Sequence, residues 1–286
     1  MQIDQPSLTA LGAARLRAAH QLLDGASILV DTLATRILGP DIENALRHAR
    51  LCDHFSRSYM PGPELRWFIA ARARIAEDAL KAAANEGAAQ FVILGAGFDT
   101  LAYRTPLAAR LRIFEVDHAA TQARKREMLT AAAIPVPQSL SYVAMDFERE
   151  TLADVLGSAG FATAERTFFS WLGVVPYLTE PAIWRTLGYI AQLQGGADVV
   201  FDYLNQTGSF TPVSCAEYRD LAAEVTAAGE QIQSYFETAP LCAKLNMIGF
   251  RRVEDTSPKS IAARFFPVAT SSQPDKGGHI MRASTI

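Results

Sequence analysis

The sequence predicts an α/β protein with a mainly parallel, doubly wound sheet, and two observations carry this prediction. The first is that, after Gln90, short apolar runs alternate with longer stretches of helical periodicity: QFVILG, RIFEVD, SYVAMD, RTFFSWLG and ADVVFDYL. Such alternation is typical of βα units whose helices cover both faces of a sheet. The second is that the first three of these runs end on glycine or an acidic residue, at the strand end where such sheets bind ligands. We expect this domain to span residues 89–286.

The preceding residues, 1–88, show helical periodicity alone and predict an N-terminal helical cap. The first set of apolar residues at helical spacing is Leu8, Leu11, Ala14, Leu16 and Ala19. The second is Ile28, Leu29, Leu33 and Ile37, and the Gly39-Pro40 pair ends it. A third helical run, ELRWFIAARARIAEDALKAAAN, follows the turn at Pro61-Gly62-Pro63.

Composition excludes several classes of protein. With 286 residues, 49% of them hydrophobic and a net charge of -3, the chain can bury a core and has no global basic field for a nucleic acid. Its most apolar window, TFFSWLGVVPYL, is shorter than the roughly 20 residues of a membrane span. The N-terminus lacks the pattern of a secretion signal. The three cysteines, Cys52, Cys215 and Cys242, have no zinc-site spacing. We expect a cytoplasmic protein without a metal; its oligomeric state stays open.

The stretch FVILGAGFDTLAYR points to a ligand at the end of the first strand. Gly95 and Gly97 let a ligand approach the main chain, and the helix start at Asp99 offers free amide donors. A tight turn that needs glycine for its backbone angles alone is the other interpretation. Asp117 ends the second run about 20 residues further on, where an acid binds a ribose diol; Glu115 lies on the same side of that strand and is the alternative.

The third run adds an adenine site to this pattern. Asp146 follows SYVAM and can accept a hydrogen bond from an adenine amino group, and Phe147 beside it can cover the ring. A glycine turn, a ribose acid and an adenine acid in this order predict an adenosine ligand.

The charge pattern separates two adenosine cofactors. The dinucleotide fingerprint has a third glycine, whereas Thr100 stands at that position here. Asp99 is unfavourable beside a pyrophosphate but suits a ligand with a cationic amine. S-adenosylmethionine carries an amine and a sulfonium and no phosphate. We therefore favour it, with an NAD(P)-dependent oxidoreductase as the alternative.

Four segments, GAGFDTLAYR, FEVDH, ARARIAED and VPYLTEPAIWRTL, together resemble the leucine carboxyl methyltransferase family, which includes bacterial O-methyltransferases of polyketide tailoring. The resemblance covers most of the chain. Its N-terminal part has Asp31-Thr32-Leu33-Ala34 where the family usually has Asp-Pro-Leu-Ala. It implies a Rossmann-like, seven-stranded methyltransferase sheet with an N-terminal helical cap, and S-adenosyl-L-methionine as cofactor. A non-catalytic, methyltransferase-like interaction module is the third alternative.

Carried over residue by residue, the resemblance assigns the cofactor site. It implies that Arg72, or its neighbour Arg74, holds the cofactor carboxylate. It also implies that Gly95 and Gly97 line the methionine moiety and that Asp117 binds the ribose, while Asp146 and Phe147 frame the adenine. The chain departs from the family after the fourth strand, where Leu172 stands in place of an acid, so the contact to the cofactor amine is missing or made by the backbone. Trp171 beside it either walls the active site or belongs to the core.

The expected reaction is transfer of a methyl group to a carboxylate or hydroxyl of a small-molecule acceptor. Alignment of the acceptor oxygen with the methyl group dominates such catalysis. We name no catalytic base; the available polar side chains are His20, His54, His118, Tyr177 and Tyr203. The residues that select the acceptor are expected in the N-terminal helices and in a helical lid insertion around 206–232. The alternative for residues 206–232 is a helical hairpin that completes the core.

Overall fold

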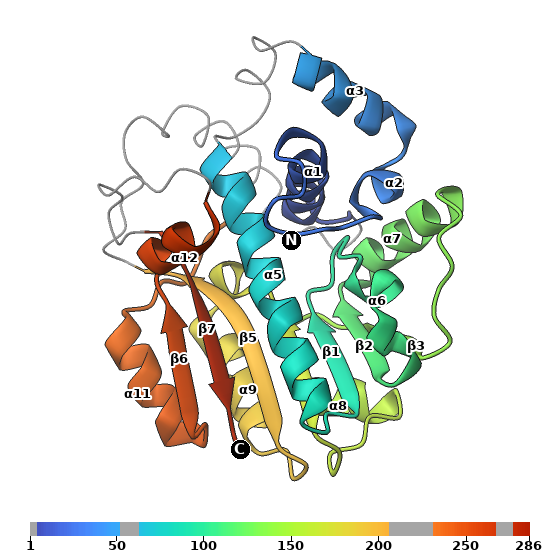
Figure 1. Cartoon of the computed structure of the whole chain (residues 1–286). Coiled ribbons are helices and arrows are strands. Elements are labelled where there is room, and N and C mark those ends of the chain that lie inside the picture. Colours follow the sequence, from blue (N-terminus) through green and yellow to red (C-terminus); the bar gives the residue numbers. More distant parts are fainter. Residues whose placement is uncertain (1–4, 52–62, 206–230, 267–276) are drawn as a thin grey trace.

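The computed structural model describes residues 5–51, 63–205, 231–266 and 277–286. These contain a seven-stranded sheet with the order β3-β2-β1-β4-β5-β7-β6. Figure 1 shows this sheet with most of its strands labelled. The strands are β1 (Gln90–Leu94), β2 (Arg112–Asp117), β3 (Leu140–Ala144), β4 (Thr167–Trp171), β5 (Ala197–Leu204), β6 (Arg252–Thr256) and β7 (Gly278–Ser284). Neighbours from β3 to β5 pair in parallel, and β7 is antiparallel to both β5 and β6. The predicted fold class is confirmed.

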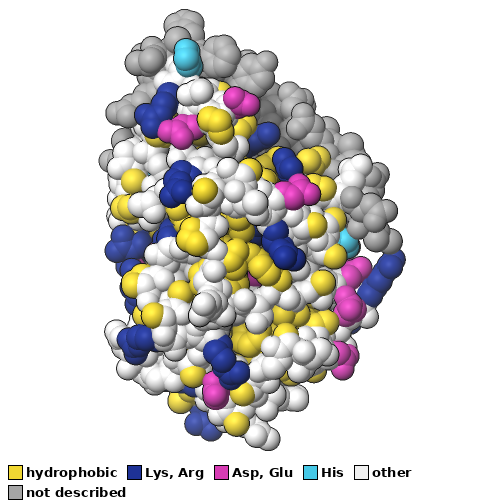
Figure 2. Space-filling view, turned by 90° about the vertical axis from the view of Figure 1, so that its right-hand side faces the viewer, with side chains coloured by type: hydrophobic (Ala, Val, Ile, Leu, Met, Phe, Trp, Pro, Cys, Tyr) yellow, Lys and Arg dark blue, Asp and Glu magenta, His cyan; other side chains and the backbone are white. Residues whose placement is uncertain are grey.

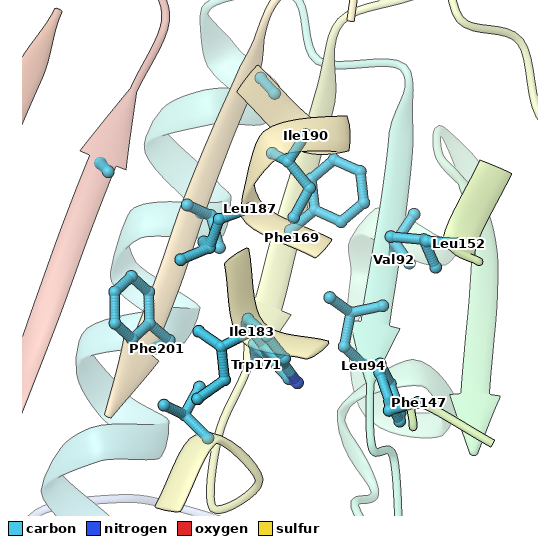
Figure 3. Close-up of a cluster of buried hydrophobic side chains, with 14 of the residues drawn as sticks. Val92, Leu94, Phe147, Leu152, Phe169, Trp171, Ile183, Leu187, Ile190 and Phe201 are labelled. Carbon is cyan, nitrogen blue, oxygen red and sulfur yellow. The ribbon is translucent and has the colours of Figure 1, made fainter. Parts of the chain in front are cut away.

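Helices cover both faces of this sheet. Those of the described chain are α1 (Leu8–Leu23), α2 (Ala34–Leu38), α3 (Pro40–Leu51), α5 (Pro63–Asn85), α6 (Leu101–Arg104), α7 (Ala119–Ala131), α8 (Leu152–Ser158), α9 (Glu180–Ala191), α11 (Thr238–Ile248) and α12 (Pro258–Phe265). Because side chains alternate along a strand, Val92 and Leu94 pack in the cluster with α8, α9 and α11. Figure 3 shows this cluster, with Leu187 and Ile190 of α9 beside Phe169 of β4.

The opposite face packs against α5. Its small residues, among them Ala76 and Ala83, share a buried cluster with Phe91 and Ile93 of β1 and with Ile261 of α12. Figure 1 shows α5 lying along the sheet, with α1, α2 and α3 above the carboxyl ends of the parallel strands. The division of the chain at residue 88 stays a prediction, since α5, the last helix before it, packs directly on the sheet.

The predicted second helix is wrong for its first half. Ile28, Leu29 and Leu33 are buried but lie in the connection that precedes α2, and only Ile37 is helical. The backbone N–H groups of Ile28 and Leu29 both donate to Nε2 of His20 at 3.2 Å. A side chain of α1 thus satisfies two backbone donors of this connection. Helix α2 ends before Gly39, as predicted.

Buried charges join this connection to the turn after β1. Asp31 accepts from Oγ1 of Thr100 at 2.6 Å and lies 3.3 Å from Nε of Arg104. Arg17 of α1 donates through Nη2 to the carbonyl of Phe98 at 2.6 Å. The Asp31–Ala34 segment that resembles the family's N-terminal motif therefore helps to fix the loop that follows the first strand.

The ion pair between Asp24 and Arg66 is expected to hold α1 against α5. Arg66 donates to both carboxylate oxygens, at 2.7 and 2.8 Å, and His20 contacts the same group at 2.9 Å. Burial acts to raise the pKa of Asp24, but Arg66 and His20 outweigh it and hold that pKa well below its usual range. We predict that Asp24→Asn lowers the free energy of unfolding at pH 7 by about 2–4 kcal/mol, measured by urea denaturation.

Because the folded-state pKa of Asp24 is depressed, its contribution is present above the unfolded-state value near 3.8 and is lost as the pH falls toward the folded-state value. The difference between wild type and Asp24→Asn should therefore shrink below about pH 4. The control is Glu43→Gln, which breaks the more exposed Glu43–Arg47 pair and should cost less than about 0.5 kcal/mol. Equal losses of unfolding free energy in the two variants would contradict the stabilising role of the Asp24–Arg66 pair.

Candidate functional site

The turn after β1 lies at the carboxyl edge of the sheet and requires both of its glycines. Gly95 has φ +63° and Gly97 has φ +44°, and the amides of Gly95 and Ala96 donate to the carbonyl of Val116. A Cβ at Gly95 would collide with Val174, and one at Gly97 would lie 2.9 Å from Cβ of Ala10. Backbone angles and protein neighbours thus account for both glycines, and the turn also brings their backbone next to Asp117.

Asp117 ends β2 and closes over this turn. Its Oδ2 accepts from the Gly97 amide at 2.5 Å, and its Oδ1 accepts from the His118 amide at 2.6 Å. Burial raises the pKa of Asp117, while the two backbone donors oppose the shift. Each carboxylate oxygen has a second lone pair that can accept a hydrogen bond from a ligand hydroxyl. Beside it, the buried Nδ1 of His118 has no partner within the described ranges.

Glu115, the alternative ribose ligand, is unavailable. It is fully buried, and its carboxylate accepts from Nζ of Lys125 at 2.7 Å and from the hydroxyl of Tyr103 at 2.9 Å. Burial raises the pKa of Glu115 against the opposing charge of Lys125. Burial together with the Glu115 carboxylate likewise raises the pKa of Tyr103. Of the two acids on this side of β2, only Asp117 reaches the edge of the sheet.

The residues after β3 divide between surface and core. The carboxylate of Asp146 is one-third exposed and accepts from the Glu148 amide at 3.0 Å. Phe147 is 8% exposed and stacks on Trp171 with ring centroids 6.0 Å apart. Figure 3 places Phe147 and Trp171 in the buried cluster, so Trp171 is a core residue. Asp146 is therefore the more accessible of the two residues predicted to frame an adenine.

The structure separates the two arginines of α5. Arg74 has a side chain that is 46% exposed and pairs with Asp78 one helical turn away. Arg72 has a side chain that is only 13% exposed, and its Nη1 donates to Oδ2 of Asp202 at 2.8 Å. Asp202 lies near the carboxyl end of β5. Arg72 therefore reaches the carboxyl edge of the sheet, and Arg74 does not.

Asp202 is a residue of this site that the sequence analysis did not identify. Its Oδ1 accepts from the Gly173 amide at 2.5 Å while Oδ2 accepts from Arg72, so it joins α5, β4 and β5. The signal was present, because ADVVFDYL is one more apolar run with an acid near its carboxyl end. Leu172, at the position where an acid was expected, packs instead against the α5 side of the core.

Asp99 is engaged within the turn. Its Oδ1 accepts from the Leu101 amide at 2.6 Å, and its Oδ2 lies 3.5 Å from Nη1 of Arg17. Burial acts to raise the pKa of Asp99, but the charges of Arg17, Lys125 and Arg104 outweigh it and lower that pKa. Asp99 is therefore an anionic group that helps to cap the short helix after β1.

Most other polar candidates have structural roles or lie outside the described residues. His20 binds backbone amides as above, and the hydroxyl of Tyr203 donates to Asp255 at 2.9 Å. Tyr177 lies in the short 3-10 helix η2 (Val175–Tyr177), and its carbonyl accepts from Gln233. His54 and residues 206–230 of the predicted lid lie outside the described residues.

The described ranges contain neither a metal-binding cluster nor a membrane-spanning helix. No group of three or more His, Cys, Asp or Glu side chains there could hold a metal ion. No helix there is both long and apolar enough to cross a membrane.

A hollow of about 210 Å³ adjoins the glycine turn. Phe98, which directly follows Gly97, lines it together with Leu11 of α1, Ile42 of α3 and Met128 of α7. Arg15 and Arg124 also line it. The hollow thus combines an apolar lining with cationic groups and lies among the N-terminal helices, where acceptor choice was expected.

Comparisons with known proteins identify the family of this chain. The sequence profile named leucine carboxyl methyltransferase matches residues 10–191, which is more than half of the chain. The chain belongs to the leucine carboxyl methyltransferase family. This membership makes it a methyltransferase by class, and it confirms the resemblance in the sequence, including the part carried by α1 and by Asp31–Ala34.

A relative from Bacillus subtilis (strain 168), YktD, is 31% identical to this family member over 284 residues, which cover 93% of each chain. Its name describes it as an S-adenosyl-L-methionine-dependent methyltransferase. Two solved structures share the fold. A methyltransferase from Thermobifida fusca has a TM-score of 0.55 and 15% identity, covering 99% of this chain and 96% of that one. A DUF574 family protein from Streptomyces avermitilis has a TM-score of 0.54 and 16% identity, covering 100% of both chains.

We predict that this family member needs glycine at position 173 for the placement of Arg72. Gly173 has φ +74°, and a Cβ there would lie 2.6 Å from Nη2 of Arg72. Gly173→Ala should therefore destabilise the protein by about 1–3 kcal/mol, measured by thermal denaturation. The control is Gly188→Ala within α9, where a Cβ has open space and should stabilise by about 0.5–1 kcal/mol. A neutral Gly173→Ala would contradict the proposed constraint.

Proposed function

We propose that this protein transfers a methyl group from S-adenosylmethionine to a carboxylate or hydroxyl oxygen of a small-molecule acceptor. S-adenosylmethionine-dependent methyl transfer follows from membership of the family and from the likeness to YktD over 93% of both chains. The choice of oxygen, and of a small molecule, is our proposal. The observation that carries the cofactor-binding part of the proposal is the carboxyl edge itself, where Asp117 closes the glycine turn and Arg72 lies inward beside Asp202.

The residues at this edge fit the cofactor. Asp117 would accept from the ribose hydroxyls, and the unpartnered Nδ1 of His118 is a second polar group next to them. Arg72 makes one hydrogen bond within the described ranges, through Nη1, so its other N–H donors can hold a carboxylate.

The glycine turn would line the methionine moiety through Gly95 and Gly97. Asp146 would accept from the adenine amino group, with Phe147 next to it in the chain. The side chain of Asp146 is open to solvent in part, whereas Phe147 contributes mainly through its packing on Trp171.

Catalysis then depends on position more than on proton transfer. S-adenosylmethionine supplies the methyl group together with its own leaving group. The protein aligns the acceptor oxygen and excludes water from it. A carboxylate acceptor is ionised near neutral pH and needs no base, whereas a hydroxyl would benefit from one. His20 and Tyr203 are engaged in structural hydrogen bonds, whereas His118 directly follows Asp117 and its buried Nδ1 has no partner within the described ranges.

Surface charge and the glycine turn weigh against a nucleic acid and against a dinucleotide as ligands. On the face shown in Figure 2, basic and acidic side chains are interspersed rather than gathered into a continuous basic surface. This distribution and the net charge of -3 favour a small acceptor over a nucleic acid. Thr100, at the position of the third dinucleotide glycine, is fully buried and bonded to Asp31. Membership of the methyltransferase family sets aside both the nicotinamide-dependent oxidoreductase and the non-catalytic module.

The reaction can be identified with methyl-labelled S-adenosylmethionine and a cell extract divided into small-molecule, protein and RNA fractions. We predict label in the small-molecule fraction. Label that becomes volatile on mild alkali indicates a methyl ester, and alkali-stable label indicates an ether. Heat-inactivated protein is the control. Label found only in RNA or only in protein would contradict the proposed acceptor class.

We predict that Asp117 recognises the ribose hydroxyls. Asp117→Ala should lower the affinity for S-adenosylhomocysteine by about 2–4 kcal/mol in a calorimetric titration, because two charge-assisted hydrogen bonds are lost. An analogue without the 2′- and 3′-hydroxyls controls for loosening of the turn, since wild type and variant should bind it with similar affinity. Equal losses for both ligands would assign Asp117 to the turn alone.

A further inference from the structure

Asp202 lies next to the position of Leu172, where the family resemblance led us to expect an acid. The parallel pairing of β4 with β5 ends at Trp171 and Phe201. Leu172 and Asp202 are each one residue beyond that last pair, so they lie at the same level on adjacent chains. Trp171 and Phe201 both belong to the cluster with α9, and side chains alternate, so the next residue on each chain faces α5. Asp202 thus places a carboxylate at the level of Leu172, on the adjacent strand.

The contacts of Asp202 confirm this direction. It is paired at 2.8 Å with Arg72, which comes from α5. It also accepts from the amide of Gly173, the residue after Leu172. The side chain of Asp202 is 6% exposed and that of Arg72 is 13% exposed, so water screens the pair only weakly.

Such a pair is not explained by stability alone. Burying two charges costs hydration energy that their attraction offsets only in part, and apolar side chains of similar size are often as good. A second buried pair lies at the opposite end of the same strand, where Arg166 contacts Asp198 at 3.0 Å. The two pairs differ in position: Asp198 lies at the amino end of β5, and Asp202 at the carboxyl edge that binds ligands in parallel sheets.

Adjacent opposite charges are complementary to an α-amino acid, which carries an ammonium and a carboxylate on one carbon. We propose that Arg72 and Asp202 together form a clamp for the amino-acid end of the cofactor, in which Asp202 accepts hydrogen bonds from the α-ammonium while Arg72 donates to the α-carboxylate. This inference rests on the proposed function and adds Asp202 as a specificity-determining residue. Asp202 then makes the contact that Leu172 cannot make.

The clamp can be tested with three ligands in calorimetric titrations. S-adenosylhomocysteine carries both groups, its desamino analogue keeps only the carboxylate, and methylthioadenosine has neither. We expect Asp202→Asn to lower the affinity for S-adenosylhomocysteine by about 10- to 100-fold and to change the affinities for the other two by less than about threefold. The matched control is Asp198→Asn at the other end of β5, which should leave the affinities for all three ligands within about twofold.

Equal losses for the three ligands, or no loss for S-adenosylhomocysteine, would overturn the clamp. Wild-type protein gives an independent test that does not depend on folding of a variant: it should prefer S-adenosylhomocysteine to the desamino analogue by at least about tenfold. Equal wild-type affinities would refute the role of Asp202 and leave the proposed function intact. Failure of wild-type protein to bind any of the three ligands would instead refute the proposed function itself.

Discussion

The parallel pairing of β1 with β2 on one side and β4 on the other is the constraint on which the rest of the structure depends. The chain runs from β1 to β2 and β3 on one side of β1, and then returns to β4 and β5 on the other side. The connections that follow β1 and β4 therefore leave in opposite directions along the sheet. Helices cover both faces, and α1 to α3 lie over the carboxyl ends of the strands (Figure 1). A ligand that binds at this edge meets the ends of β1, β2, β4 and β5 together, and the side chains there decide which ligand it is.

Charge at that edge is arranged in two halves. At the end of β2, Asp117 holds the backbone of the glycine turn and offers lone pairs to hydroxyls. At the ends of β4 and β5, Arg72 and Asp202 form a pair of opposite charges around Gly173. An adenosyl amino acid has the matching order of groups, with a neutral diol at one end and a zwitterion at the other. A pyrophosphate would instead bring negative charge toward Asp99.

The apolar runs predicted β1 to β5, all of which except β3 are largely buried. They did not predict β6 and β7, and the motif order pointed to Asp117 because it lies at a strand end. Helical spacing also predicted a helix from Ile28 to Ile37, whose first half is wrong. The chain there leaves a turn with Gly25 and Ala26 at positive φ, and the amides of Ile28 and Leu29 donate to His20. Spacing could not separate Arg72 from Arg74, since the choice depends on which side of α5 meets the sheet. Asp202 was missed because its partner Arg72 is 130 residues away in sequence.

The identity of the cofactor is the central claim, and a calorimetric titration of the wild-type protein tests it most directly. S-adenosylmethionine, S-adenosylhomocysteine, NAD and NADP would be titrated under the same conditions. The arrangement of Asp117, Arg72 and Asp202 predicts micromolar affinity for the two adenosyl amino acids and no measurable binding of either dinucleotide. Tight binding of a dinucleotide together with no heat from S-adenosylhomocysteine would contradict the account.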